Sequence, residues 1–173
     1  LITTLAAMVM AARGIPPVLL TLWTLLGGAL AAASAGAFNC VYDADIDTKM
    51  RRTMTRPLPR GAITPNRALA FAMVLGVTSF LLLNYLVNPL AAWLSLGGNA
   101  YYVFVYTMWL KRTTPQNIVI GGFAGAIPPL VGWAAVTGTL GWPAIALALL
   151  IFLWTPPHFW ALSLMTETDY DKA

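Results

Sequence analysis

The chain has 173 residues, of which 59% are hydrophobic and only 9% are charged, and its formal net charge is +4. Soluble domains carry roughly 25% charged residues, so this composition excludes an ordinary soluble protein and indicates an integral membrane protein. The basic excess is better explained by loops held on the cytoplasmic side than by nucleic-acid binding. The single cysteine, Cys40, excludes an internal disulfide framework.

Charge-free runs long enough to cross a bilayer, which takes about 20 residues, divide the chain. Residues 1–12 are shorter and are interpreted as the second half of a cut helix, followed by a turn at the Gly-Ile-Pro-Pro run. One span is expected at 18–39, two within 68–110 and two within 113–166. The sequence predicts an all-α transmembrane bundle, a fragment with five full spans and one partial span.

Basic residues gather at one end of these spans. The segment 43–67 carries six of them and the segment 111–116 carries Lys111 and Arg112, whereas the turns at 84–89 and 138–141 carry none. The positive-inside rule places the basic segments in the cytoplasm, with Arg13 as the exception. All the acidic residues fall on the same side, which this rule does not require: Asp43, Asp45, Asp47, Glu167, Asp169 and Asp171. Two acidic clusters with bases between them indicate a site for an ionic ligand.

Asn39, Asp43 and Asp47 are spaced four residues apart at the end of the first full span. Each step of four turns a helix by only about 40°, so the three side chains are expected on one face. Carboxylates stacked in this way repel unless a cation lies between them, and Mg²⁺ takes one or two carboxylates plus phosphate oxygens. The competing interpretation is a solvated, Asp-rich helix end. Asp45 falls on the opposite face, where solvation is favoured.

The basic residues have two competing interpretations. Arg52 and Arg56 are four residues apart and could bind a phosphate as forked donors, or they could simply anchor the loop. Lys111 and Arg112 end a span beside a polar run that closes with Asn117, and they too could be topology anchors.

His158 lies inside the last span, in the stretch Trp154-Thr155-Pro156-Pro157-His158. Ionisable groups within a membrane are usually functional, so His158 is a candidate metal ligand, proton carrier or hydrogen-bond partner. The alternative is a purely structural hydrogen bond. The two prolines are expected to break the helix, which could open a cavity there.

Three stretches carry a resemblance. The Asn39-x3-Asp43-x3-Asp47 pattern followed by MRRTMTRPLPRG resembles the first aspartate-rich motif of the intramembrane UbiA-type prenyltransferases. The stretches LKRTTPQNIVIGGFAGAIPPLVGWAAVTG (110–138) and WTPPHFWALSLMTETDYDKA (154–173) resemble the heme-prenylating branch of that family more specifically. The resemblance extends over essentially the whole chain.

The resemblance implies a bundle of nine helices around a cavity open to the cytoplasm. Residues 1–173 would then be a single domain truncated at both ends, with about three C-terminal helices missing. Members of this branch transfer the farnesyl group of farnesyl diphosphate to a vinyl group of heme b, giving heme O. The family's metal is Mg²⁺. The expected surroundings are the lipid bilayer, without nucleic acid, and any membrane partners from the heme pathway are left open.

The resemblance also assigns roles to residues. Asp43 and Asp47 would hold one Mg²⁺ with Asn39 beside it, and Asp169 a second. Diphosphate contacts are expected from Arg52, Arg56, Lys111, Arg112 and Asn117, and His158 is a candidate heme contact. Many family members have a second pair of Asp residues four apart, but Met165 stands four residues before Asp169 here, which leaves the roles of Glu167 and Asp171 open.

Two other functions remain as alternatives. Another family member would prenylate a quinone or chlorophyll precursor, although the Pro-Pro-His-Phe-Trp stretch favours heme. A cation transporter could use Asp43 and Asp47, but transporters bind near the bilayer midplane and these acids lie at a span end. The expected location is the plasma membrane of a bacterium, as a multi-pass protein, with the mitochondrial inner membrane as the alternative.

Overall fold

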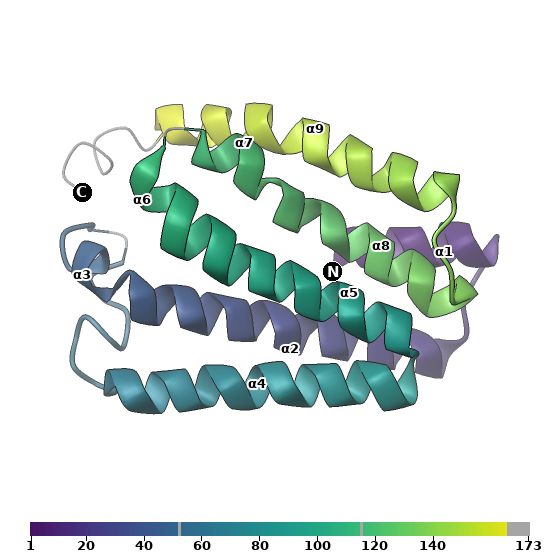
Figure 1. Ribbon diagram of the computed structural model, residues 1–173, viewed down its shortest axis with the longest axis horizontal. Helices are drawn as coiled ribbons and strands as arrows, with labels where there is room; N and C mark the ends of the chain where they lie inside the picture. The colour runs from purple at the N-terminus through teal and green to yellow at the C-terminus, as the bar shows by residue number, and fades with distance from the viewer. Residues whose placement is uncertain (52, 115, 166–173) are drawn as a thin grey trace.

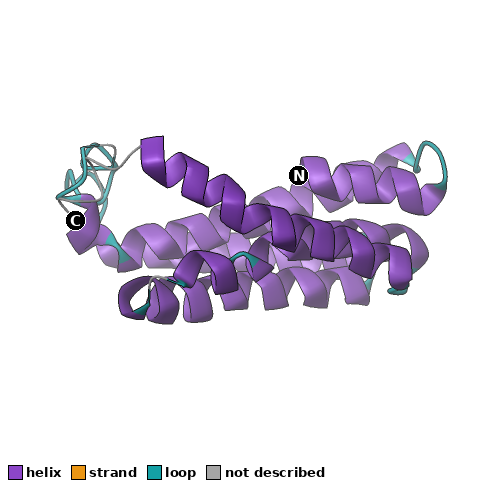
Figure 2. Cartoon of the chain, turned by 90° about the horizontal axis from the view of Figure 1, so that it is seen from above, coloured by secondary structure: helices purple, strands orange, loops and turns teal. Residues whose placement is uncertain are grey.

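The computed structural model describes residues 1–51, 53–114 and 116–165, and every regular element in these ranges is helical. Figure 1 shows the long helices side by side along one direction, and Figure 2 shows the bundle turned by 90°, with helices and loops as its elements. The elements are α1 (Ile2–Ala12), α2 (Val18–Tyr42), α3 (Ala44–Asp47), α4 (Pro65–Leu86), α5 (Pro89–Ala100), the π-helix η1 (Tyr101–Leu110), α6 (Lys111–Thr113), α7 (Asn117–Gly121), α8 (Phe123–Thr137) and α9 (Trp142–Met165).

Four helical runs are long and apolar enough to cross a membrane: Val18–Tyr42, Pro65–Leu86, Asn117–Thr137 and Trp142–Ala161. A fifth run forms where α5, η1 and α6 follow one another without a break over residues 89–113. The shorter apolar α1 accounts for the partial span. Many large apolar side chains on these helices are exposed, as lipid contact requires. The chain is therefore a membrane protein with the predicted all-α architecture.

The turns between spans begin helices by familiar means. Pro65 and Pro89 occupy the first turn of α4 and α5, where a missing N–H costs nothing. The Asn88 side chain caps α5 by accepting a hydrogen bond from the Ala91 N–H, while its amide donates to the Ala134 carbonyl in α8. Gly138 ends α8 in the left-handed conformation, with φ of 68°. Asn88 therefore joins α5 to α8 as well as starting α5.

Small and hydroxyl-bearing residues let the helices approach closely, as is usual in membranes. The Ser34 hydroxyl in α2 donates to the Ala72 carbonyl in α4 at 2.8 Å, and the Ser79 hydroxyl donates back to the Gly27 carbonyl at 2.7 Å. A Cβ placed at Gly132 in α8 would lie 2.2 Å from the Thr4 carbonyl oxygen in α1. The backbones of α2 and α4, and those of α1 and α8, therefore approach each other closely.

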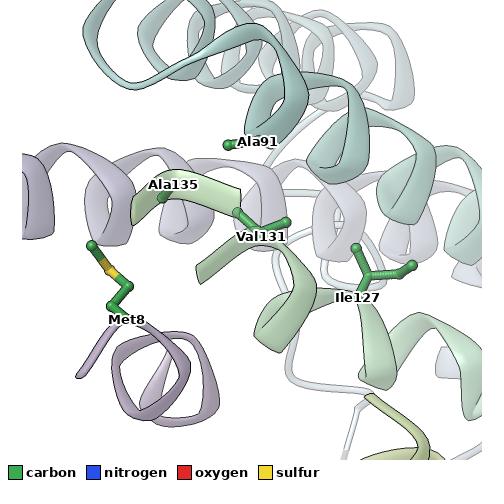
Figure 3. Packing of buried hydrophobic residues seen from close by; sticks show 5 residues of the cluster. All are labelled: Met8, Ala91, Ile127, Val131 and Ala135. Carbon is green, nitrogen blue, oxygen red and sulfur yellow. The ribbon is translucent and has the colours of Figure 1, made fainter. Parts of the chain in front are cut away.

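The buried apolar cluster lies where α1, α5 and α8 meet. Figure 3 shows its five members pointing toward one another from these helices: Met8, Ala91, Ile127, Val131 and Ala135. Three of the five come from α8, which contacts α1, α5 and α9. α8 is thus the central helix of this half of the bundle.

The expected break at Pro156 and Pro157 is wrong, because both lie inside the continuous helix α9. Proline in a helix removes one hydrogen bond and frees a carbonyl, but helices in membranes tolerate this when other groups satisfy the carbonyls. Beside the prolines, the Thr155 hydroxyl donates to the Ile151 carbonyl one turn earlier at 2.6 Å. The prolines therefore do not interrupt the span.

The chain reverses direction from span to span, so α2 ends and α4 begins at the same end of the bundle, where η1 also passes into α6 (Figure 1). This end carries the loop 43–64 and the segment 111–116, while Arg13 lies at the opposite end. The fold thereby brings the two basic segments of the sequence together.

Candidate functional site

Each of the three acids at the end of α2 and in α3 pairs with a neighbouring base. Lys111 donates to Asp43, Arg56 donates to Asp47 at 2.8 Å, and Arg112 pairs with Asp45 at 2.8 Å. The side chains of Asp43 and Asp47 are 1% and 5% exposed, whereas that of Asp45 is 63% exposed. The four-residue spacing therefore does put the first two acids on one buried face and Asp45 on another.

Asp43 joins α2 to α3 without losing the helical spacing. Its N–H donates to the Asn39 carbonyl, and the Asp47 N–H donates to the Asp43 carbonyl, so the i to i−4 pattern runs through the junction. The Thr53 hydroxyl adds a hydrogen bond to the Asp47 carbonyl at 3.1 Å. These contacts fix the backbone that carries both buried acids.

Asn39 is oriented by a residue that the sequence does not single out. The buried Thr107 hydroxyl in η1 donates to Asn39 Oδ1 at 3.2 Å. The Asn39 amide oxygen thus has a hydrogen-bond partner across the α2–η1 interface. A threonine inside an apolar run gives no sequence signal for this contact.

One oxygen of Asp43 stands out. Asp43 Oδ1 is buried and has no hydrogen-bond partner among the described residues, and Arg112 Nη2 lies 3.6 Å away from it. Buried polar atoms usually have a partner, so this oxygen is a place where a ligand would supply one. A carboxylate oxygen is the type of ligand that Mg²⁺ prefers. In the ranges that the structure describes, however, no three His, Cys, Asp or Glu side chains form a metal-binding group.

Arg112 is held by several contacts. Its guanidinium donates two hydrogen bonds to the Asp45 carboxylate, at 2.8 and 3.1 Å, and one to the Tyr42 carbonyl at 3.0 Å. The guanidinium carbon also lies 4.6 Å from the centre of the Tyr42 ring. Tyr42 is anchored in turn, because its hydroxyl donates to the Met108 carbonyl at 3.1 Å. α6 is therefore joined to the end of α2.

The ion pairs favour the charged forms of their members. The hydrogen bond from Arg112 lowers the pKa of Asp45, and the same hydrogen bond raises the pKa of Arg112. Burial is the largest single influence on Arg56 and opposes its charge, but the hydrogen bond to Asp47 and the nearby negative charges of Asp47 and Asp43 together raise the pKa of Arg56. Asp45, Arg56 and Arg112 therefore remain charged at neutral pH and can pair with an ionic ligand.

A cavity of about 700 Å³ lies within the bundle, between α2, α5, η1, α7, α8 and α9. Small residues of α2 form one wall, and tyrosines of η1 and aromatic residues of α9 form others. The lining includes Gly28, Ala32, Ala35, Gly36, Asn99, Tyr102, Tyr106, Gly121, Gly125, Trp154, His158 and Phe159. This volume is in the range of small-molecule sites, which are mostly apolar with a few polar groups.

The α2 wall of the cavity leads toward the acids. Gly28, Ala32 and Gly36 are spaced by four residues, and Asn39 and Asp43 continue the same face. None of the three described acids lines the cavity itself, and Asp43 and Asp47 pair instead with Lys111 and Arg56. An apolar volume and a charged end therefore follow one another along α2.

His158 lines this cavity, as its position in the last span suggests. Its ring stacks on Trp154 with centroids 4.2 Å apart and 16° between the planes, and meets Phe159 edge-on. Its place on the wall comes from the turn of α9, not from a break at the prolines.

The other predicted residues fall into two groups. The Asn117 amide donates to the Thr114 carbonyl, which keeps it beside the segment that follows Lys111. Arg52, Glu167, Asp169 and Asp171 lie outside the described residues. Tyr42, Tyr102 and Tyr106 were not predicted, because an aromatic residue in an apolar span gives no sequence signal of its own.

The chain matches the UbiA prenyltransferase family over residues 1–173. It is 60% identical over 173 residues to a protoheme IX farnesyltransferase of Gloeobacter violaceus, covering 100% of this chain and 57% of that protein. It is 61% identical to a protein of the same name from Picosynechococcus sp. over 98% of this chain and 54% of that protein. The protein of that name from Paenarthrobacter aurescens is 56% identical over 100% of this chain and 54% of its own length.

The chain thus spans about half the length of the curated relatives it matches. No solved structure matches it.

Proposed function

Since the chain belongs to the UbiA prenyltransferase family, we propose that it is part of an enzyme that transfers the farnesyl group of farnesyl diphosphate to a vinyl group of heme b, giving heme O. The observation that carries this proposal is the pairing of the buried acid Asp43 with Lys111 at the end of a helix face that also walls a 700 Å³ cavity. The names of relatives 56–61% identical to the chain support the same substrates.

The charged end is suited to a diphosphate. Lys111 and Arg112 converge on Asp43 from α6, and Arg56 approaches from the loop beside Asp47. In this proposal these three bases contact the diphosphate, with Arg52 and Asn117 as further contacts. Charge builds on the diphosphate oxygens as the allylic C–O bond breaks, so fixed cations there stabilise the transition state more than the ground state.

The residues that would hold Mg²⁺ fit that ion. Asp43 offers a buried oxygen that has no hydrogen-bond partner in the part of the chain that the structure describes, Asp47 a second buried carboxylate, and Asn39 an amide. Mg²⁺ is commonly bound by one or two carboxylates with substrate phosphates completing the set, and when bound it would neutralise charge on the leaving group. Asp169 is proposed as a further ligand.

The cavity is suited to the apolar substrates. Its glycine and alanine wall on α2 leaves room for an isoprenoid chain beside the charged end. Enclosing the chain among apolar residues would keep water from the allylic cation until the electron-rich vinyl group attacks it. His158, on the α9 wall next to Trp154, is the proposed heme contact, through the iron or a propionate.

The test is a reconstitution of the full-length protein with heme b, farnesyl diphosphate and Mg²⁺, followed by the mass of the products. We expect a farnesylated, hydrated heme that forms only when all three are supplied. A product formed from a quinone precursor but not from heme would assign the chain to another branch of the family. We further propose that the protein resides in a bacterial plasma membrane, as its bacterial relatives suggest.

A further inference from the structure

Asp45 makes contacts that an acid serving only to solvate a helix end would not need. Both of its carboxylate oxygens accept hydrogen bonds from Arg112, at 2.8 Å from Nη2 and 3.1 Å from Nη1. This two-point arrangement fixes the plane of the guanidinium, which a single contact would not do. The backbone beneath it is also fixed, because the Thr48 hydroxyl donates to the Asp45 carbonyl at 2.7 Å.

Tyr42 supplies the other hydrogen bond and the ring contact of Arg112. Nη2 donates to the Tyr42 carbonyl, and the guanidinium lies over the Tyr42 ring. A guanidinium has five N–H donors, of which Asp45 and Tyr42 take three. Among the described residues the other two have no protein partner, so donors of a rigidly held cation remain for an anion.

The direction in which Arg112 is held matters. Its Nη2 lies 3.6 Å from the unpartnered Asp43 Oδ1, which is beyond hydrogen-bond length. The cation therefore stands next to the buried acid without closing the space around that oxygen. Lys111, the preceding residue, binds the other oxygen of the same carboxylate. Asp45 thus acts on the site through Arg112 and not through contact with Asp43.

We propose that Asp45 is a positioning residue, which holds the Arg112 guanidinium so that one of its remaining N–H groups meets the diphosphate of the substrate. This inference rests on the proposed function, because it assumes that an anion binds beside Asp43. It assigns a role to the acid that sequence reasoning left to solvation. Tyr42 completes the arrangement as a platform beneath the guanidinium.

The sign of one kinetic change separates this role from a simple charge effect. Removing the negative charge of Asp45 leaves the surroundings more positive, so electrostatics alone would tighten the binding of a diphosphate. The same tightening is expected if Asp45 competes with the substrate for Arg112. Loss of a positioning contact predicts the opposite, weaker binding, because the guanidinium would no longer be held in place.

The experiment uses full-length protein carrying Asp45→Asn, Asp45→Glu, Arg112→Gln, or Asp45→Asn with Arg112→Gln. We expect Asp45→Asn to raise the KM for farnesyl diphosphate, and the Kd for inorganic diphosphate with Mg²⁺, about two- to fivefold, the size typical of an exposed ion pair. The kcat should change much less, and Asp45→Glu should restore part of the affinity. In the Arg112→Gln background, Asp45→Asn should have no further effect.

A lower KM in Asp45→Asn, or an equal rise in both backgrounds, would overturn the positioning role. The binding of inorganic diphosphate needs no heme, so it separates this inference from the proposed function. If the unaltered protein binds diphosphate but makes no farnesylated heme, the proposed acceptor is wrong while the Asp45 result stands. If it binds no diphosphate, both proposals fall.

Discussion

The charged end and the cavity of this protein are built from opposite materials. At the charged end each described acid has a cationic partner: Asp43 with Lys111, Asp45 with Arg112, and Asp47 with Arg56. The cavity wall on α2 is made of glycine and alanine, and only a minority of all the residues that line the cavity are polar. In the proposed function, the charged end selects its ligand by charge and by the geometry of its hydrogen-bond donors. The cavity selects its ligand by the room that the small glycine and alanine residues leave. Each region can therefore be disabled separately.

The largest effect is expected at Asp43. Asp43→Asn keeps the shape of the side chain but removes its charge, and we expect product formation to fall roughly 10²- to 10³-fold, as after the loss of one preorganised group that stabilises developing charge. Asn is preferred to Ala because the residue is buried against Lys111. A thermal melt of the same sample tests folding. Near-normal turnover in a folded Asp43→Asn protein would remove Asp43 from the site.

Lys111 should show the next largest effect. Lys111→Ala removes a charge-assisted contact worth about 1.5–3 kcal/mol, which at about 1.4 kcal/mol per decade lowers kcat/KM for the diphosphate about tenfold to a hundredfold. Heme binding should change little, because Lys111 does not line the cavity. If heme affinity fell and diphosphate kinetics stayed normal, the assignment of the diphosphate to the charged end and of heme to the cavity would have to be reversed.

The cavity can be narrowed from α2 at Gly36, which is one of its lining residues. A Cβ at Gly36 meets no atom within 4 Å, so the side chain of Gly36→Leu enters the open volume. We expect activity with farnesyl diphosphate to fall about tenfold, within the range for a misfit in an apolar pocket, and activity with the shorter geranyl diphosphate to fall less.

Gly97→Leu is the matched control for this change. A Cβ at Gly97 also meets nothing within 4 Å, but this glycine does not line the cavity. Its kinetics should stay close to normal. Equal losses at Gly36 and Gly97 would show that the helices, and not the cavity, respond to the added bulk.

His158→Ala is expected to have the smallest effect. It should shift the Soret band of the heme-loaded protein and weaken heme binding about two- to tenfold, if the lost contact is worth a typical 0.5–1.5 kcal/mol. Diphosphate binding should be unchanged, because His158 lies on the α9 wall. An unaltered spectrum with an earlier melt would instead assign His158 a structural role with Trp154.

The spans and the charged end are largely predictable from the sequence for the same reason. In an apolar chain a charge is conspicuous, so charge-free lengths mark the spans, and the spacing of Asp43 and Asp47 marks a shared helix face. Their separate burial from Asp45 follows from helix geometry alone. What the spacing does not predict is the partner of each acid, because Arg112 meets Asp45 across 67 positions of sequence.

The cavity is less predictable. Gly121 reads as a helix-packing residue, and a Cβ there would indeed lie 2.3 Å from the Tyr106 ring, yet both residues also line the open volume. Whether a small residue admits a neighbouring helix or leaves space depends on what faces it. Pro156 and Pro157 mislead for a similar reason, since proline breaks a helix in water but is tolerated inside membrane helices such as α9.

The π-helical segment Tyr101–Leu110 has a consequence for the length of the chain. It connects α5 to Lys111 with hydrogen bonds five residues apart, while the flanking helices repeat at four. Removing one residue from an α-helix rotates all that follows by about 100°, and the wider turn of a π-helix makes this rotation somewhat smaller. A deletion between Tyr101 and Leu110 would thus turn Lys111 away from Asp43, even with every remaining side chain unchanged. Descendants of this sequence should accept exchanged residues in the segment far more readily than a lost or gained one.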